Sequence, residues 1–280
     1  MKKRIKVLLA GVKAGGGHIS LRDFLYQQLE TDQETFRNVS WTHPGEALET
    51  ADHLIHSISP FLYELTYFFS PRYLSDISTI ATFNFLRECY KVLKSEKPDI
   101  VLSTHFVLSL HFSLAKRLLR SKAVIVNCIP DYGPPSKIMH PRLPFFRSDR
   151  LMVFEEWTRK GSAQQYKVPE EDILLAGFNP KKVFAQTAAK YKTKRDARLQ
   201  LMKVLDYMPY TQMDPDKTTV LVSAGAVDSR KTFKLLKILA REQKNDPSLI
   251  DRYQFLVITG RDMKYFERIS GNSKKVPVLE

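Results

Sequence analysis

The sequence lacks the cysteine patterns and the long apolar runs that define several large protein classes. Its two cysteines, Cys89 and Cys128, lie far apart, and neither has a CxxC motif or a Cys/His cluster beside it. This argues against a disulfide scaffold and against a zinc site, and it fits a reducing compartment. No run reaches the length of about 18 apolar residues that is needed to span a bilayer. We therefore expect a protein that is soluble or lies on a membrane surface.

Positive charge, in contrast, is abundant. The chain has 44 Lys and Arg against 30 Asp and Glu in 280 residues, a formal net charge of +14. Such an excess implies attraction to an anionic partner, which could be nucleic acid, anionic lipid or a phosphorylated small molecule. Nucleic acid ranks low, because the basic residues are scattered and no recognition motif interleaves them with aromatic residues. Length alone suggests about two domains.

Apolar runs alternate with stretches of helical periodicity over the first two thirds of the chain. Strands are expected at residues 4–11, 38–43, 99–103, 123–130, 149–154 and 172–177, and helices at 18–29, 45–59, 75–96, 106–119 and 155–166. This alternation predicts parallel pairing with right-handed crossovers, hence a doubly wound α/β sheet. We assign residues 1–180 to one Rossmann-like domain.

The pattern lapses over residues 178–193 and then begins again. We expect a hinge and a linking helix at residues 181–215, followed by the first half of a second Rossmann-like domain at 216–280. That second domain shows only two convincing strands, 218–225 and 253–260.

The segment GVKAGGGHIS joins the first strand to the first helix through Gly15, Gly16 and Gly17, with His18 directly after them. Ligands of open α/β sheets bind beyond the carboxyl ends of the strands, and glycines there let the backbone approach a ligand closely. The helix start favours an anion or an oxygen-rich group. Neither the P-loop motif nor the dinucleotide GxGxxG motif fits. A glycine turn needed only for tight packing remains the alternative.

Polar residues follow two further strands of the predicted sheet. Thr104 and His105 end the third strand and Asp131 ends the fourth, so all should face the same cleft as His18. An imidazole at His18 could take a proton from an incoming hydroxyl. The alternatives are helix capping for Thr104 and His105, and turn formation for Asp131.

An aromatic segment after Pro60 offers a different surface. Its members could insert at the interface of an anionic membrane with basic side chains nearby, although an ordinary packed helix is the alternative for any single residue. The candidate membrane-contact residues are Phe61, Tyr63, Tyr67, Phe68 and Phe69.

Together these features resemble a known family. GGGH after the first strand, the aromatic segment, KPDIVLSTHF, the turn at Asp131 and AGFNPKKVF resemble the monogalactosyldiacylglycerol synthase and processive diacylglycerol glucosyltransferase family. The resemblance covers about residues 5–185 and continues more weakly through VLVSAGA, and the glycine loop is its most specific part.

The resemblance implies a GT-B glycosyltransferase with two Rossmann-like domains, bound peripherally to the inner face of the cell membrane. It would move a hexose from a nucleotide sugar, such as a UDP-sugar, to a diacylglycerol-type lipid with inversion, using no metal or cofactor. By position, His18 is then catalytic, and Gly225 matches the early glycine turn of the donor domain. The acceptor cleft would contain Gly15, Gly16, Gly17, Thr104, His105 and Asp131.

Two departures from the family pattern leave alternatives open. Plant members tend to carry an acidic residue where this chain has Lys13, so His18 must serve as the base or no base exists. The family's donor-binding motif also comes later in the second domain than this sequence extends. The chain could therefore be a fragment, one half of a split enzyme whose second chain holds the donor, or a non-catalytic domain that binds lipid or a partner.

Overall fold

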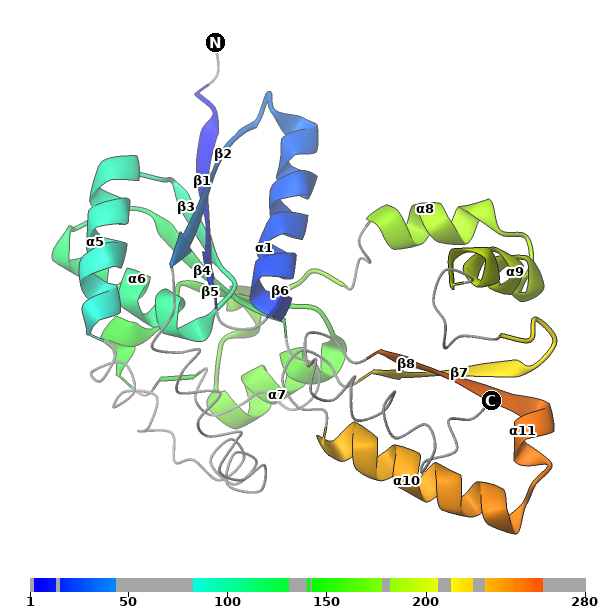
Figure 1. Cartoon of the computed structure of the whole chain (residues 1–280). Coiled ribbons are helices and arrows are strands. Elements are labelled where there is room, and N and C mark those ends of the chain that lie inside the picture. Colours follow the sequence, from blue (N-terminus) through cyan, green and yellow to red (C-terminus); the bar gives the residue numbers. More distant parts are fainter. Residues whose placement is uncertain are drawn as a thin grey trace. The chain divides into compact units, whose positions relative to one another are not determined.

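The chain divides into two compact units, Met1–Asn179 and Pro180–Glu280. The computed structural model shown in Figure 1 describes residues 3–13, 16–43, 83–130, 140–141, 143–177, 182–205, 213–223 and 230–258.

The first unit contains a parallel sheet of six strands, which confirms the predicted fold class. The sheet has the order β2-β1-β3-β4-β5-β6, and every neighbouring pair is parallel. Its strands are β1 (Ile5–Val12), β2 (Phe36–His43), β3 (Ile100–Ser103), β4 (Val124–Ile129), β5 (Arg150–Val153) and β6 (Ile173–Leu175). They match the expected ranges closely because continuous apolar runs are typical of strands that are buried on both faces.

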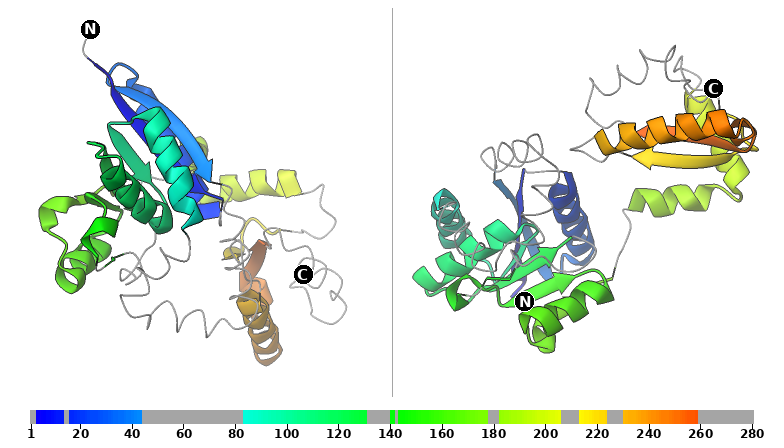
Figure 2. Two further views of the ribbon diagram at one scale, coloured as in Figure 1. Left: turned by 90° about the vertical axis from the view of Figure 1, so that its left-hand side faces the viewer. Right: turned by 90° about the horizontal axis from the view of Figure 1, so that it is seen from below.

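Helices cover both faces of this sheet (Figure 2). They are α1 (Gly16–Leu29), α5 (Asn84–Glu96), α6 (Phe106–Leu118) and α7 (Glu156–Tyr166), with short 3-10 turns at Glu30–Asp32, Pro144–Phe146 and Glu170–Asp172. Along β1, Val7 and Leu9 pack in the cluster beneath α1, whereas Leu8 and Ala10 pack in the cluster beneath α5 and α6. The alternation of side chains along one strand thus supplies two separate cores.

The second unit is smaller and differs from the prediction in one element. No regular element was expected over residues 178–193, where the sequence pattern lapses, but α8 (Lys182–Lys190) lies within that range. Its sequence KVFAQTAAK contains three alanines and two lysines, which favour a helix. The remaining elements are α9 (Lys194–Leu205), β7 (Thr218–Ser223), α10 (Arg230–Asn245), α11 (Leu249–Arg252) and β8 (Tyr253–Ile258). Strands β7 and β8 pair in parallel as a two-stranded sheet.

Within the described ranges, no helix is long and apolar enough to cross a membrane. Cys89 and Cys128 are both buried and unbridged. Burial raises the pKa of the Cys128 thiol to about 12, so it stays protonated at neutral pH.

Candidate functional site

The glycine loop and the residues after β3 meet at the point where the topology of the sheet reverses. From β1 the chain continues through α1 to β2 on one side, whereas from β3 it continues through α6 to β4 on the other side. Because β1 and β3 are neighbours, the segments that follow them leave in opposite directions from this point, which is the usual ligand position in such sheets. The backbone N–H of Thr104 donates to the carbonyl of Ala10 over 2.9 Å and holds the two ends together.

His18 lies in the first turn of α1 and is half-buried. Its Nδ1 lies 2.5 Å from the backbone carbonyl oxygen of Thr104. A carbonyl can only accept, so Nδ1 carries a proton in this contact, and in the neutral form of the ring Nε2 keeps its lone pair. The contact therefore leaves His18 with a proton acceptor on the far side of the ring.

The side chain of Thr104 is fully buried and serves the same junction. Its hydroxyl donates to the carbonyl of His18 over 2.9 Å and lies 3.4 Å from the carbonyl of Ala10. Thr104 thus connects β1, the first turn of α1 and the end of β3. This hydroxyl is engaged within the protein, which agrees with a structural role for the side chain.

His105 is the N-cap residue of α6 and is 8% exposed. Its Nδ1 accepts from the backbone N–H of Val107 over 3.3 Å, which places the proton of the neutral ring on Nε2. The His18 and His105 rings meet edge to face, with centroids 4.6 Å apart. Burial lowers the pKa of His105 well below its ordinary value of 6.5, and the nearby His18 lowers it further. His105 is therefore neutral at physiological pH.

Buried hydroxyl groups bind the backbone carbonyl of His105, and Ser109 and Asn127 of this network were not predicted. Ser103 donates from its hydroxyl to the carbonyl of His105 over 3.0 Å. Ser109 on α6 donates to the side-chain oxygen of Asn127 on β4 over 2.9 Å. Only the packing of α6 on the sheet brings Ser109 and Asn127 together, since they lie far apart in sequence.

The glycines of the loop differ in their surroundings. A Cβ on Gly17 would meet no atom of the described residues within 4 Å, so among them open space lies beside this backbone. A Cβ on Gly11, which the sequence analysis did not single out, would lie 3.2 Å from Cδ of Arg22 and 3.5 Å from the Thr104 hydroxyl. Gly16 begins α1, and Gly15 lies outside the described residues.

Several predicted site residues lie outside the part of the chain that the structure describes. These are Asp131, Gly225 and the membrane-contact candidates Phe61, Tyr63, Tyr67, Phe68 and Phe69. Of the described candidates, the structure brings His18, Thr104 and His105 together.

His43, at the end of β2, is a further histidine at the carboxyl edge of the sheet. Its ring stacks on Phe85 with centroids 4.0 Å apart, and its carbonyl accepts from the N–H of Lys13 over 3.0 Å. Burial lowers the pKa of His43, although Glu88 opposes the shift. Because Phe85 belongs to the core beneath α5 and α6, His43 packs on the face opposite to α1.

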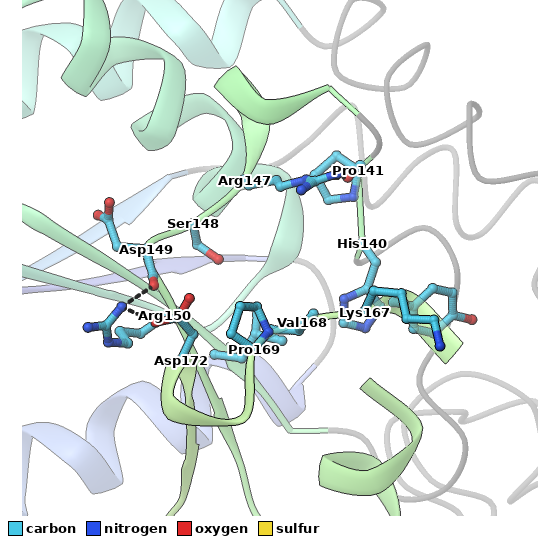
Figure 3. A pocket seen from close by; sticks show the side chains of 12 residues that line it. His140, Pro141, Arg147, Ser148, Asp149, Arg150, Lys167, Val168, Pro169 and Asp172 are labelled. Carbon is cyan, nitrogen blue, oxygen red and sulfur yellow. Dashed lines mark hydrogen bonds and ion pairs between the residues drawn. The ribbon is translucent and has the colours of Figure 1, made fainter. Parts of the chain in front are cut away.

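A pocket of about 240 Å³ lies at the opposite edge of the sheet, at the amino ends of β5 and β6 (Figure 3). Its charged groups largely satisfy one another: Asp149 accepts two bonds of 2.8 Å from Lys116, and Arg150 pairs with Asp172. These ion pairs stabilise the starts of β5 and β6, so we do not choose this pocket as the candidate functional site. Over the described ranges, no group of three His, Cys, Asp or Glu side chains is placed to hold a metal ion.

Comparison with known proteins gives a family match over more than half of the chain. The sequence profile of the family described as monogalactosyldiacylglycerol (MGDG) synthase matches residues 22–177. No curated protein matches the chain.

Solved structures resemble the chain in fold at low sequence identity. Staphylococcus aureus MnaA in complex with UDP gives a TM-score of 0.56 at 14% identity, covering 99% of this chain and 66% of that one. A glycosyltransferase from Rickettsia africae gives 0.56 at 11% identity, with 99% and 67% covered. The UDP-GlcNAc 2-epimerase from Neisseria meningitidis gives 0.55 at 14%, with 97% and 70% covered. The chain thus has a GT-B type fold and spans about two thirds of the length of these structures.

Proposed function

Because the chain belongs to the monogalactosyldiacylglycerol synthase family, we propose that it transfers a hexose from a nucleotide sugar to a diacylglycerol-type lipid. The arrangement of His18 carries the proposal. A neutral imidazole with Nδ1–H bound to a backbone carbonyl, at the switch point of the sheet, presents Nε2 as a proton acceptor.

The proposed reaction is a single displacement with inversion. Nε2 of His18 removes the proton from the acceptor hydroxyl as the hydroxyl oxygen forms its bond to the anomeric carbon of the sugar. The bond between that carbon and the diphosphate oxygen breaks, and the electron pair leaves with the nucleoside diphosphate. Such general base catalysis contributes typically about 10²- to 10⁴-fold to a rate.

The glycine loop is suited to bind the negatively charged diphosphate group of the donor. The open space beside Gly17 lets a ligand approach the backbone, and the N–H groups at the start of α1 favour negative charge. A UDP-sugar is the proposed donor, and two of the structurally similar proteins were solved with UDP or UDP-GlcNAc bound. The fold alone does not choose between a transferase and an epimerase, so the choice rests on the family.

A transfer assay tests the proposal. Purified protein is incubated with vesicles of diacylglycerol and anionic phospholipid and with a panel of radiolabelled UDP-sugars, and glycolipid is counted. We expect product from the wild type and a loss of about 10²-fold or more in kcat for His18→Gln. Glutamine keeps a polar amide group of similar size but cannot act as a base, so the variant removes proton transfer with little change in volume. Full activity of His18→Gln would exclude His18 as the base.

Membrane association is the second part of the proposal. The net charge of +14 favours anionic headgroups, and the aromatic segment 61–69 is the proposed contact. Vesicle flotation should show binding to anionic vesicles that weakens as salt is raised, and little binding to neutral vesicles. Equal binding to both vesicle types would contradict an electrostatic contact.

A second candidate function follows from the second unit, whose described residues form a sheet of only two strands. In this alternative the chain is an acceptor domain that binds lipid, either without catalysis or with a second chain that supplies the donor site. Vesicle binding without product from any UDP-sugar would support it. Product formed only after addition of a partner chain would identify a split enzyme.

A further inference from the structure

We propose that Thr104 and His105 are positioning residues that hold the His18 imidazole in the Nδ1–H tautomer. The inference deepens the function proposed above and rests on it for its catalytic meaning. In water, free neutral imidazole of histidine favours the other tautomer, with the proton on Nε2, so a protein that needs Nε2 as a base must reverse this preference.

Two contacts fix the ring, one at its polar edge and one at its side. The Thr104 carbonyl oxygen lies 2.5 Å from Nδ1 and can only accept. The His105 ring meets the His18 ring at 62° with centroids 4.6 Å apart, which limits rotation of the imidazole about its Cβ–Cγ bond.

A third contact holds the backbone of His18. The buried Thr104 hydroxyl donates over 2.9 Å to the backbone carbonyl of His18, in the first turn of α1. Thr104 therefore contacts His18 at two points: its carbonyl oxygen binds the ring, and its hydroxyl binds the backbone carbonyl. A shift of His18 that breaks one of these hydrogen bonds would also weaken the other.

His105 is itself held rigidly, which a positioning residue requires. Its Nδ1 is occupied by the N–H of Val107, and its ring stacks on Phe106 with centroids 4.9 Å apart. The Ser103 hydroxyl binds its carbonyl. Its low pKa keeps it uncharged beside His18, so it offers a packing surface without competing for the proton.

Nuclear magnetic resonance of the full chain labelled with ¹⁵N-histidine tests the tautomer directly. The His18 signals are assigned by their loss in His18→Gln. We expect, above neutral pH, a protonated Nδ1 and an unprotonated Nε2 for His18. The opposite tautomer, or an equal mixture, would overturn the inference whether or not the protein transfers a sugar.

Three variants test the two residues. Thr104→Val removes the hydroxyl at nearly constant volume and Thr104→Ser restores it; His105→Asn removes the ring and keeps a strong N-cap side chain. We expect Thr104→Val and His105→Asn to shift His18 toward the mixed tautomer and to lower kcat about tenfold with little change in KM, while Thr104→Ser stays near wild type.

The outcomes separate the two proposals. An Nδ1–H tautomer in a wild type that transfers no sugar would support the positioning and reject the proposed function. Active protein whose His18 tautomer and kcat are unchanged in Thr104→Val and His105→Asn would reject the positioning alone.

Discussion

Gly17 and Gly11 lie close together in the chain but have different surroundings. A Cβ on Gly17 would lie more than 4 Å from every atom that the structure describes, and alanine is favoured over glycine in a helix by up to about 1 kcal/mol. We therefore expect Gly17→Ala to keep or raise the unfolding temperature and yet to lose transfer activity, because its methyl group enters the space proposed for the ligand. Thermal unfolding and the transfer assay measure both effects.

Gly11→Ala is the matched control for this prediction. Its Cβ would lie 3.4 Å from Ile19 and 3.2 Å from Arg22, so it should lower stability through crowding beneath α1. Unchanged activity in Gly17→Ala would mean that no ligand approaches this part of the loop.

Burial of His105 predicts a pH dependence of stability. Its pKa is well below 6.5 in the folded chain, whereas the unfolded chain takes up a proton near 6.5. Stability should therefore be independent of this group above 6.5 and should fall as the pH drops below it, by up to about 1.4 kcal/mol per pH unit for one proton. His43 acts in the same direction, because its pKa is also lowered.

Denaturant unfolding between about pH 5 and pH 8 measures this slope. In His105→Asn, the slope of the unfolding free energy against pH should decrease by an amount that corresponds to up to one proton. A variant with the slope of the wild type would show that His105 is protonated in the folded protein.

Among the secondary-structure elements, two strands begin directly after an aspartate that binds the neighbouring strand. Asp99 precedes β3 and binds β1, and Asp149 precedes β5 and binds β4. Asp99 accepts from the N–H of Lys6 over 2.8 Å, and Asp149 accepts from the N–H of Ile125 over 2.7 Å. The N–H of Lys6 lowers the pKa of Asp99, with Lys3 adding to the shift. The starts of β3 and β5 are thus stabilised in the same way, by a carboxylate that accepts from a backbone N–H of the neighbouring strand.

We expect Asp149→Ala to cost about 1–3 kcal/mol, because it leaves the N–H of Ile125 and the ammonium of Lys116 without their acceptor. Asp172→Ala, which removes a surface pair with Arg150, should cost about 0–1 kcal/mol. Denaturant unfolding of both variants gives the comparison. Equal costs would mean that the strand-start bond adds nothing beyond a surface ion pair.

The same elements show what could be predicted from the sequence. Strand β1 was predictable because its apolar run is continuous, and the meeting of His18 with His105 followed from the rule for carboxyl ends of parallel strands. Helix α8 was not, because it has only nine residues and follows Gly177 and Pro180, which are typical of a loop. The bond between Ser109 and Asn127 depends on how α6 packs on β4, which no local pattern records.

At the scale of the whole molecule, the two units differ in how much core the described residues provide. Among the described residues of Pro180–Glu280, the buried hydrophobic residues are Val222 and Leu236, whereas Met1–Asn179 contains three clusters of buried hydrophobic residues. Two-stranded sheets are marginally stable at best on their own. The first unit therefore has the means to fold by itself, whereas the described residues of the second unit do not form a comparable core.

We expect a fragment of residues 1–179 to unfold in one cooperative transition and to keep the His18 contact with Thr104, because both residues and all six strands lie within it. A fragment of residues 180–280 should show no cooperative transition. Circular dichroism during thermal unfolding distinguishes the two. Cooperative unfolding of the second fragment would show that its remaining residues complete a core, and it would weaken the candidate function in which a second chain supplies the donor site.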